Sequence, residues 1–196
     1  MKKPLELPEN FSNRMKETLG EEFEDFTSAL ETSSPISIRK NPAKPVDAFD
    51  DCLPVPWCPE GRYLPERPSF VEDPLIFAGS YYVQEASSMF LSEVMQQHAP
   101  LDTALKVLDL CAAPGGKSTL LASLLNQDSF LVSNEIVSKR IAPLVENVVR
   151  WGIPNVLVSN NNPQQFEALL DFFDVVVVDA PCSGEGMFRK DFKALQ

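Results

Sequence analysis

The sequence has few of the residues from which metal sites and disulfide frameworks are built. Its only histidine is His98, and its four cysteines, Cys52, Cys58, Cys111 and Cys182, form no Cys-x-x-Cys pair. A zinc site needs several closely spaced Cys or His ligands, and a disulfide-rich domain needs more cysteines at regular spacing. We therefore predict no metal site and interpret the four cysteines as reduced thiols.

The sequence also lacks long apolar runs and an excess of positive charge. No run approaches the ~20 apolar residues of a membrane span, and the N-terminus, MKKPLELPEN, has no apolar stretch of the kind found in signal peptides. The 17 Lys and Arg against 28 Asp and Glu give a net charge of -11, which argues against nucleic-acid binding by bulk attraction to phosphate. We predict a cytoplasmic protein without membrane contact.

The composition is that of a globular protein. A hydrophobic content of 44% and a mean hydropathy of -0.11 exclude disorder, collagen and coiled coil. The length of 196 residues suffices for one full domain and a partial second one.

The N-terminal half shows helical and strand patterns on either side of a proline-rich stretch. Apolar spacing over residues 9–31, interrupted at Gly20, predicts two short helices, and alternation over 36–38 predicts a short strand. Nine of the 17 prolines lie between positions 35 and 74, so we expect an extended connector without regular elements there. Helical spacing returns over 84–99. The predicted apolar side of that helix comprises Ala86, Met89, Phe90 and Met95.

From Leu105 onward, β-branched runs alternate with segments of helical spacing. The runs KVLDL, SFLVSN, NVLVS and FDVVVVDA predict four parallel strands with right-handed crossovers. The last run, Val175–Val178, is apolar in both alternating phases, which predicts a strand covered on both faces rather than an edge. Because the sequence stops at Gln196, we expect that strand's neighbours to be missing, the sequence to be a fragment, and chains to associate through the open strand.

The first of these strands runs into the turn CAAPGGKS, which opens a helix. Open α/β sheets bind ligands at this place, since Gly115 and Gly116 let a ligand approach the backbone and the helix start offers free N–H groups. Cys111 stands where a Walker phosphate loop needs glycine, and no Gly-x-Gly-x-x-Gly occurs. Glu135, at the end of the next strand, is placed to bond ribose hydroxyls. The alternative interpretation is an ordinary strand-to-helix turn, with Lys117 as a solvated helix residue.

A carboxylate and a thiol, Asp179 and Cys182, follow the fourth predicted strand. Addition of a thiolate to C6 of a pyrimidine makes C5 nucleophilic, and a nearby acid stabilises the charge arising at N3. The pair therefore suits methyl transfer to C5 from a sulfonium donor. The alternatives are a buried cysteine that packs as a small hydrophobic residue and an aspartate that caps a turn.

Four segments occur in the order and at the spacing of known family motifs: SYYVQEASSM, LDLCAAPGGKS, SNEIVSKR and VDAPCSGEGMFRKD. They resemble those of the Sun-type, RsmB/RsmF-like RNA cytosine-C5 methyltransferases, which use S-adenosylmethionine, and NFSNRMKETLG with SIRKNP resembles the N-terminal segment of the RsmF branch. The resemblance implies an α/β fold: the first part of a Rossmann-like methyltransferase domain, with an incomplete parallel sheet, over 81–196. A small α+β segment over 1–80 would precede it and contact RNA.

The resemblance also implies roles for individual residues. Glu135 would hold the ribose of the donor, and Asp179 would lie between donor and cytosine. In the family the cysteine at the position of Cys182 assists product release, and a second cysteine, in a later Thr-Cys motif, attacks C6. No Thr-Cys occurs here, so we expect the nucleophile beyond Gln196; in DNA cytosine methyltransferases the Pro-Cys thiol is itself the nucleophile, which leaves the role of Cys182 open. The methionine part of the donor would be surrounded by Cys111, Ala112, Ala113, Pro114, Gly115, Gly116 and Lys117.

One position departs from the family pattern. Asn161 stands where the family usually has an aspartate near the adenine. Its side-chain oxygen can still accept a hydrogen bond from the adenine amine, at a cost of ~1 kcal/mol in donor binding. An equally good interpretation is a turn residue that bonds its own backbone.

The predicted function is methyl transfer from S-adenosylmethionine to C5 of cytosine in ribosomal RNA of the 16S type. The alternatives are a tRNA cytosine-C5 methyltransferase and a non-catalytic RNA-binding or ribosome-assembly factor. We expect the 196-residue chain by itself to bind donor poorly and to methylate nothing. Two basic clusters could follow an RNA backbone, or else be solvated surface: Arg39, Lys40 and Lys44, and Arg189, Lys190 and Lys193.

Overall fold

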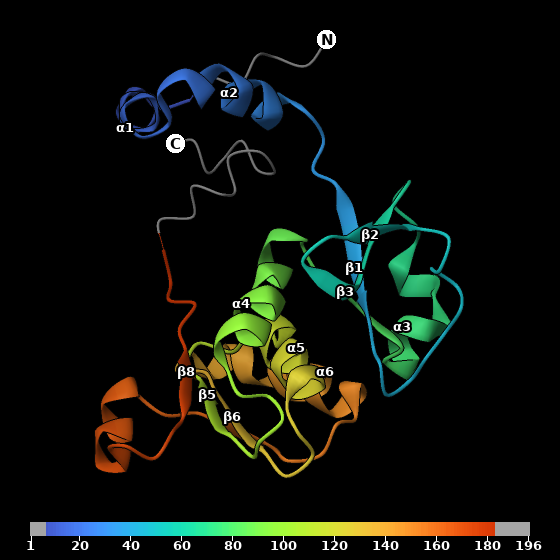
Figure 1. Ribbon diagram of the computed structural model, residues 1–196, viewed down its shortest axis with the longest axis vertical. Coiled ribbons are helices and arrows are strands. Elements are labelled where there is room, and N and C mark those ends of the chain that lie inside the picture. The colour runs from blue at the N-terminus through green and yellow to red at the C-terminus, as the bar shows by residue number, and fades with distance from the viewer. Residues whose placement is uncertain (1–6, 183–196) are drawn as a thin grey trace. The chain divides into compact units, whose positions relative to one another are not determined.

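The computed structural model describes residues 7–182 and groups the chain into two compact units (Figure 1). Among the described residues, one unit contains those up to Pro35 together with Pro181 and Cys182, and the other is Ile36–Ala180. The second unit contains an antiparallel and a parallel sheet, which confirms the α/β class. Whether the chain divides after residue 80 stays a prediction. Within residues 7–182, no helix combines the length and apolar character that crossing a bilayer requires.

The first unit contains the two predicted helices. Helix α1 (Glu9–Leu19) and helix α2 (Phe23–Glu31) are joined by a 3-10 turn, Gly20–Glu22. Gly20 has a φ of 54°, in the left-handed region that glycine adopts without strain. The ring centroids of Phe11 and Phe26 are 6.2 Å apart, so the two helices meet through aromatic side chains.

The second unit begins with an antiparallel sheet in the order β2-β3-β1-β4. Strand β1 (Ile36–Lys40) confirms the strand predicted at 36–38. The prediction that residues 35–74 lack regular elements is wrong, because β2 (Leu53–Val55) and β3 (Cys58–Leu64) form there. Strand β4 (Tyr81–Val83) completes the sheet, and short helices Phe70–Glu72 and α3 (Pro74–Ala78) precede it.

The prolines are compatible with these strands because of where they stand. Pro54 lies in β2, at the edge of the sheet, where a missing N–H need not break the ladder. Pro59 lies in β3 before Gly61, at which pairing with β1 is first recorded. The number of prolines in a segment therefore does not exclude strands when the prolines stand at such positions.

A helical segment confirms the position of the helix predicted over 84–99. It begins as a 3-10 turn, Ser87–Phe90, and continues as α4 (Leu91–His98). It starts later than predicted because the backbone of Gln84 still bonds to Ser37 of β1. Met89 and Met95 are buried as predicted, but Phe90 is 52% exposed and its placement on the apolar side was wrong.

The parallel sheet has the order β7-β6-β5-β8, which confirms the four predicted parallel strands. They are β5 (Lys106–Asp109), β6 (Phe130–Asn134), β7 (Val156–Ser159) and β8 (Val175–Val177). Helix α5 (Gly116–Leu124) follows β5; a 3-10 turn, Ser138–Arg140, and α6 (Ile141–Trp151) follow β6; and the 3-10 helix Pro163–Leu169 follows β7. Side chains of α4, α5, β5 and β6 form one core cluster: Met95, Leu105, Val107, Leu121, Ala122 and Leu131.

Strand β8 corrects the prediction of a strand covered on both faces. It stands last in the strand order and pairs with β5. Val175 and Val177 pack against the core, whereas Val176 and Val178 are 53% and 55% exposed. The apolar run is thus covered on one face within the described residues. Association of chains through this strand stays a prediction.

The antiparallel sheet is joined to the C-terminal end of α6. The side chain of Asn41 is fully buried and donates to the backbone carbonyls of Gly79, at 2.8 Å, and Trp151, at 2.9 Å. Lys44 Nζ donates to the carbonyl of Arg150 at 2.7 Å, satisfying an acceptor at the end of the helix. Gly79 has a φ of 73°, and a Cβ there would overlap the backbone carbonyl of Arg150. The junction therefore requires glycine for both conformation and space.

We predict that Gly79→Ala lowers the free energy of unfolding by about 2–4 kcal/mol, because strain and a clash with backbone add together. Gly152→Ala is the matched control: its φ is 79°, but a Cβ would meet the flexible end of Lys44, at 3.2 Å. That variant should lose only about 1 kcal/mol from backbone strain. Urea unfolding of the two variants measures the difference, and equal losses would contradict the described junction.

Candidate functional site

The carboxyl ends of three neighbouring parallel strands carry the predicted site residues. The register pairs Asp109 of β5 with Ser133 of β6 and with Val177 of β8. Glu135 and Asp179 each follow two residues after these partners. Because the strands are parallel and in register, the structure brings the glycine turn, Glu135 and Asp179 to one edge of the sheet, where such sheets bind ligands.

The turn between β5 and α5 is tied to the neighbouring strand. The N–H of Ala112 donates to the carbonyl of Asn134 at 2.8 Å, and Ala112 and Ala113 are buried. The peptide bond between Ala113 and Pro114 is cis. Pro114 is exposed and its carbonyl accepts a hydrogen bond from the side chain of Asn147 in α6 at 2.8 Å. The turn thus has fixed contacts on two sides.

The two glycines serve packing within the protein. Gly115 has a φ of 112°, and a Cβ there would lie 3.3 Å from both Asn147 Cβ and Leu144 Cδ1 of α6. A Cβ on Gly116 would lie 3.4 Å from Gln84 Nε2 and from the ring of Tyr82. In the direction of a Cβ, both glycines are therefore covered by protein atoms, so a donor would approach the turn from another side. Contact of a donor with the turn stays a prediction.

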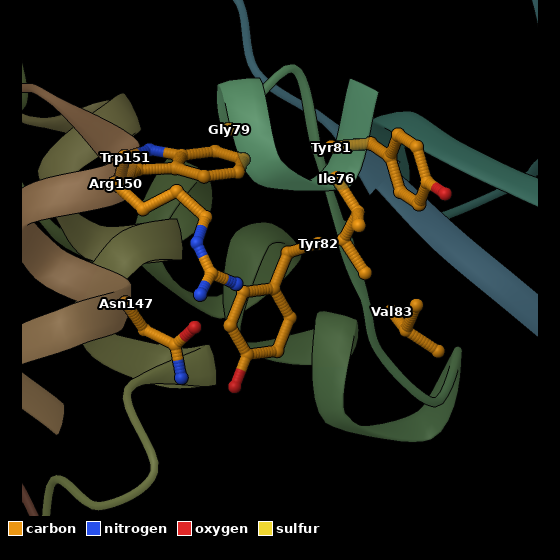
Figure 2. A pocket seen from close by; sticks show the side chains of 8 residues that line it. All are labelled: Ile76, Gly79, Tyr81, Tyr82, Val83, Asn147, Arg150 and Trp151. Carbon is orange, nitrogen blue, oxygen red and sulfur yellow. The ribbon is translucent and has the colours of Figure 1, made fainter. Parts of the chain in front are cut away.

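A pocket of about 200 Å³ lies beside this turn, between α6 and the segment that contains β4 (Figure 2). In Figure 2, the guanidinium of Arg150 points toward the ring of Tyr82, and the ring of Trp151 lies on the opposite side of the Arg150 side chain. Asn147, which bonds to Pro114, lines the same pocket. The pocket therefore borders the turn.

Glu135 is buried at the end of β6. Its Oε1 accepts a hydrogen bond from the N–H of Val137 at 2.9 Å. Its Oε2 lies 3.1 Å from Nη1 of Arg140 but makes no hydrogen bond of good geometry among the described residues. Arg140 also donates to the carbonyl of Ala113 at 2.5 Å, so it links Glu135 to the glycine turn. Oε2 is a strong acceptor that a ligand hydroxyl would satisfy.

Asp109 is a candidate site residue that the sequence interpretation missed. It is fully buried at the end of β5, and its Oδ2 accepts a hydrogen bond from Ser118 Oγ at 2.7 Å, while Oδ1 has no described partner. Burial raises its pKa from 3.8 to about 6, and the charge of Asp179 adds to this effect against the opposing influence of Ser118 and Lys117. The sequence did contain a signal that could have identified Asp109: it is an aspartate at the end of a buried strand that leads into a glycine turn.

Lys117 and Asp179 meet across the sheet edge. Lys117 Nζ lies 2.5 Å from Asp179 Oδ2, and the two side chains are 25% and 60% exposed. The alternative interpretation was that Lys117 is only a solvated helix residue. Its ion pair with Asp179 shows that it also contacts a site residue. At this exposure the ion pair adds little stability, but it directs the carboxylate toward the start of α5.

The backbone of Asn161 is hydrogen-bonded to the side chain of Asn134, the residue before Glu135. Its N–H donates to Asn134 Oδ1 at 2.9 Å, and its carbonyl accepts from Asn134 Nδ2 at 3.0 Å. The neighbouring Asn160 donates to the carbonyl of Glu135 at 2.5 Å, a contact that the sequence interpretation did not include. The structure thus places Asn161 at the same edge, and its contact with adenine stays a prediction.

The two site cysteines differ in environment. Cys182 is exposed and belongs to the unit that contains the N-terminal helices, so its role and its place relative to Asp179 stay predictions. Burial raises the pKa of Cys111, and the charges of Glu135, Asp109 and Asp179 raise it further. The thiolate form of Cys111 is therefore disfavoured, which argues against a nucleophilic role.

Burial of Arg39 contradicts its proposed contact with RNA, whereas an RNA contact of Lys40 and Lys44 stays a prediction. Arg39 is 2% exposed, Lys40 forms an ion pair with Asp50, and Lys44 bonds to the end of α6. Arg39 and Lys40 belong to β1 and Lys44 follows it, and all three have contacts within the protein. The second cluster, Arg189, Lys190 and Lys193, lies outside the described residues. No three His, Cys, Asp or Glu side chains in residues 7–182 are grouped to hold a metal ion.

Comparisons with known proteins agree with this architecture. Residues 7–86 match the family model for the N-terminal domain of 16S rRNA methyltransferase RsmF, and residues 96–195 match that for 16S rRNA methyltransferase RsmB/F. Ribosomal RNA small subunit methyltransferase F of Cronobacter sakazakii is 39% identical over 97% of this chain and 42% of its own length. The protein of that name from Vibrio cholerae is 37% identical, over 98% and 43%. The chain thus spans less than half the length of these relatives.

Solved structures show the same fold. The crystal structure of PH0851 has a TM-score of 0.83 and 27% identity, covering 96% of this chain and 44% of that one. A methyltransferase homolog protein from Pyrococcus horikoshii has a TM-score of 0.77 and 28% identity, covering 96% and 64%.

We predict that Asp109→Asn removes a pH dependence of stability. Since burial raises the folded-state pKa above the unfolded value of 3.8, the unfolded chain releases this proton first, and stability is lost as pH rises from 3.8 to about 6. Asparagine keeps an acceptor for Ser118 without the charge. Relative to wild type, its free energy of unfolding should rise by about 2 kcal/mol between about pH 4 and about pH 7.

Urea unfolding across this pH range measures the effect. Asp128→Asn, which removes an exposed carboxyl, controls for the change in net charge. A constant difference between Asp109→Asn and wild type at every pH would contradict the assigned environment of Asp109.

Proposed function

The chain belongs to the RsmB/F family of 16S rRNA methyltransferases, and we propose that the protein it represents transfers a methyl group from S-adenosylmethionine to C5 of cytosine in 16S ribosomal RNA. The observation that carries this proposal is the alignment of the glycine turn, Glu135 and Asp179 at one sheet edge by the register of β5, β6 and β8. The names of the curated relatives specify small-subunit ribosomal RNA, which supports this substrate over tRNA. Work on ribosomal RNA also fits a cytoplasmic location.

The residues at the sheet edge fit the proposed donor. Glu135 Oε2 is a buried acceptor without a hydrogen bond, as a ribose hydroxyl requires. Helix α5 begins at Gly116 and directs its free N–H groups toward the turn, where the anionic carboxylate of the amino-acid part is favoured. The turn from Cys111 to Lys117 would then lie along the methionine part, and Asn161 near the adenine. S-adenosylmethionine supplies, when bound, a methyl group activated by its sulfonium charge.

The remaining residues act on the cytosine. Asp179 is exposed at the end of β8, and its carboxyl group can turn from Lys117 to the pyrimidine; in its protonated form it can donate to N3, where negative charge arises. The raised pKa of Cys111 leaves attack on C6 to another cysteine. We assign that attack to a Thr-Cys motif in the remainder of the protein and assign product release to Cys182.

The test uses the full-length protein, labelled donor, and separated 16S rRNA and tRNA. Label should enter C5 of cytosine in 16S rRNA. Glu135→Gln should weaken donor binding about 10- to 100-fold, the effect of losing a hydrogen bond to a charged acceptor. Glu146→Gln, which removes an exposed carboxylate paired with Arg150, is the matched control and should bind donor normally. Transfer to tRNA in preference, or no transfer, would overturn the proposal.

Cys182→Ala separates product release from nucleophilic attack. If Cys182 assists release, the full-length variant should accumulate a covalent protein–RNA adduct, seen as a band of reduced mobility in a denaturing gel. Cys52→Ala, at a half-buried cysteine away from the sheet edge, should accumulate none. Loss of activity without an adduct would instead identify Cys182 as the nucleophile.

A further inference from the structure

Arg39 is a buried cation without a carboxylate partner. It is 2% exposed, and among the described residues no carboxylate forms an ion pair with it. Burial lowers its pKa to about 10, so it remains charged at neutral pH. The charge of Glu60 favours the cation without forming an ion pair, so the cost of burying Arg39 is only partly offset by charge. A role beyond packing would account for a cation in this place.

The guanidinium joins the antiparallel sheet to the start of α5. On the side of the sheet, Nε donates to Gln84 Oε1 at 2.8 Å. On the side of α5, Nη2 donates to Thr119 Oγ1 at 2.7 Å and to the carbonyl of Gly116 at 3.2 Å. Arg39 therefore contacts the first helical turn after the proposed donor site.

Thr119 carries this contact to the glycine turn. Its Oγ1 accepts from Arg39 and donates to the carbonyl of Gly115 at 2.8 Å. Gly115 is the residue with a φ of 112°. Two successive carbonyls of the turn, those of Gly115 and Gly116, are thus held by Arg39, one directly and one through Thr119.

Aromatic rings hold the guanidinium in place. The Cζ atom of Arg39 lies 4.5 Å from the centroid of the Trp151 ring and 6.0 Å from that of Tyr82. Figure 2 shows both rings, which also line the pocket beside the turn. Stacking on a ring face favours the cation at this depth.

The charge of Arg39 lies at the positive end of a helix dipole. Helix α5 begins at Gly116, and a helix N-terminus already carries partial positive charge. A cation there reinforces that potential instead of neutralising it. An anionic group bound at the turn would gain from both the helix and Arg39.

We propose that Arg39 is a positioning residue for the amino-acid end of the methyl donor. It fixes the Gly115–Gly116 turn through Thr119 and the carbonyl of Gly116, and its charge favours the donor's carboxylate at the start of α5. This inference rests on the proposed function, because it requires the donor to lie on this turn.

The test compares two ligands of the full-length protein by calorimetry. S-adenosylhomocysteine has the amino-acid group with its carboxylate, and 5′-methylthioadenosine lacks it. Arg39→Gln should weaken S-adenosylhomocysteine binding about tenfold and 5′-methylthioadenosine binding by less than about twofold, since only the first ligand meets the altered end of the site. Arg62→Gln, which removes an arginine of β3 that bonds to backbone carbonyls, is the control and should affect neither ligand.

Thr119→Val keeps Arg39 and breaks the connection to Gly115, so the inference is also tested if Arg39→Gln does not fold. It should weaken S-adenosylhomocysteine binding about threefold more than 5′-methylthioadenosine binding. In a folded variant, equal losses for the two ligands, or no loss, would overturn the inference. If wild type binds both ligands, that failure leaves the proposed function standing, whereas a wild type that binds neither contradicts the proposed function itself.

Discussion

The in-register pairing of β5 with β6 and β8 is the constraint on which the site depends. It sets Asp109, Ser133 and Val177 in one row. Whatever follows each strand then emerges at the same edge of the sheet. Glu135 and Asp179 come from segments far apart in the chain, and a shift of register in either strand would separate them. The chemistry proposed for this protein is therefore a consequence of parallel pairing more than of any single side chain.

The antiparallel sheet contacts two of the helices that adjoin this edge, α5 and α6. Asn41 and Gly79 join it to the end of α6, and Arg39 joins it to the start of α5. The same short strand, β1, carries both connections. The N-terminal sequence thus contributes to the geometry of the glycine turn, and cannot be regarded only as an attachment for RNA.

The sequence allowed prediction of what is determined locally. Helical spacing located α1 and α2, and β-branched runs located the parallel strands; that the glycine turn marks the ligand edge stays a prediction. What depends on tertiary contacts escaped prediction. Composition does not reveal burial. Arg39 was therefore placed in a surface cluster that could contact RNA, although it lies in the interior. Proline content does not reveal edge positions, so β2 was missed, and the single covered face of β8 depends on which neighbours pack against it.

Strand pairing assembles the edge, Arg39 and Thr119 connect the antiparallel sheet to the glycine turn, and Glu135 Oε2 is a buried acceptor without a hydrogen bond in the described residues. The central claim is that a nucleoside donor lies along this edge. A crystal structure of the full-length protein with S-adenosylhomocysteine tests that claim most directly. We predict ribose hydroxyls within hydrogen-bonding distance of Glu135 and the amino-acid group against the turn before α5. A nucleoside bound elsewhere, or with its ribose turned away from Glu135, would contradict it.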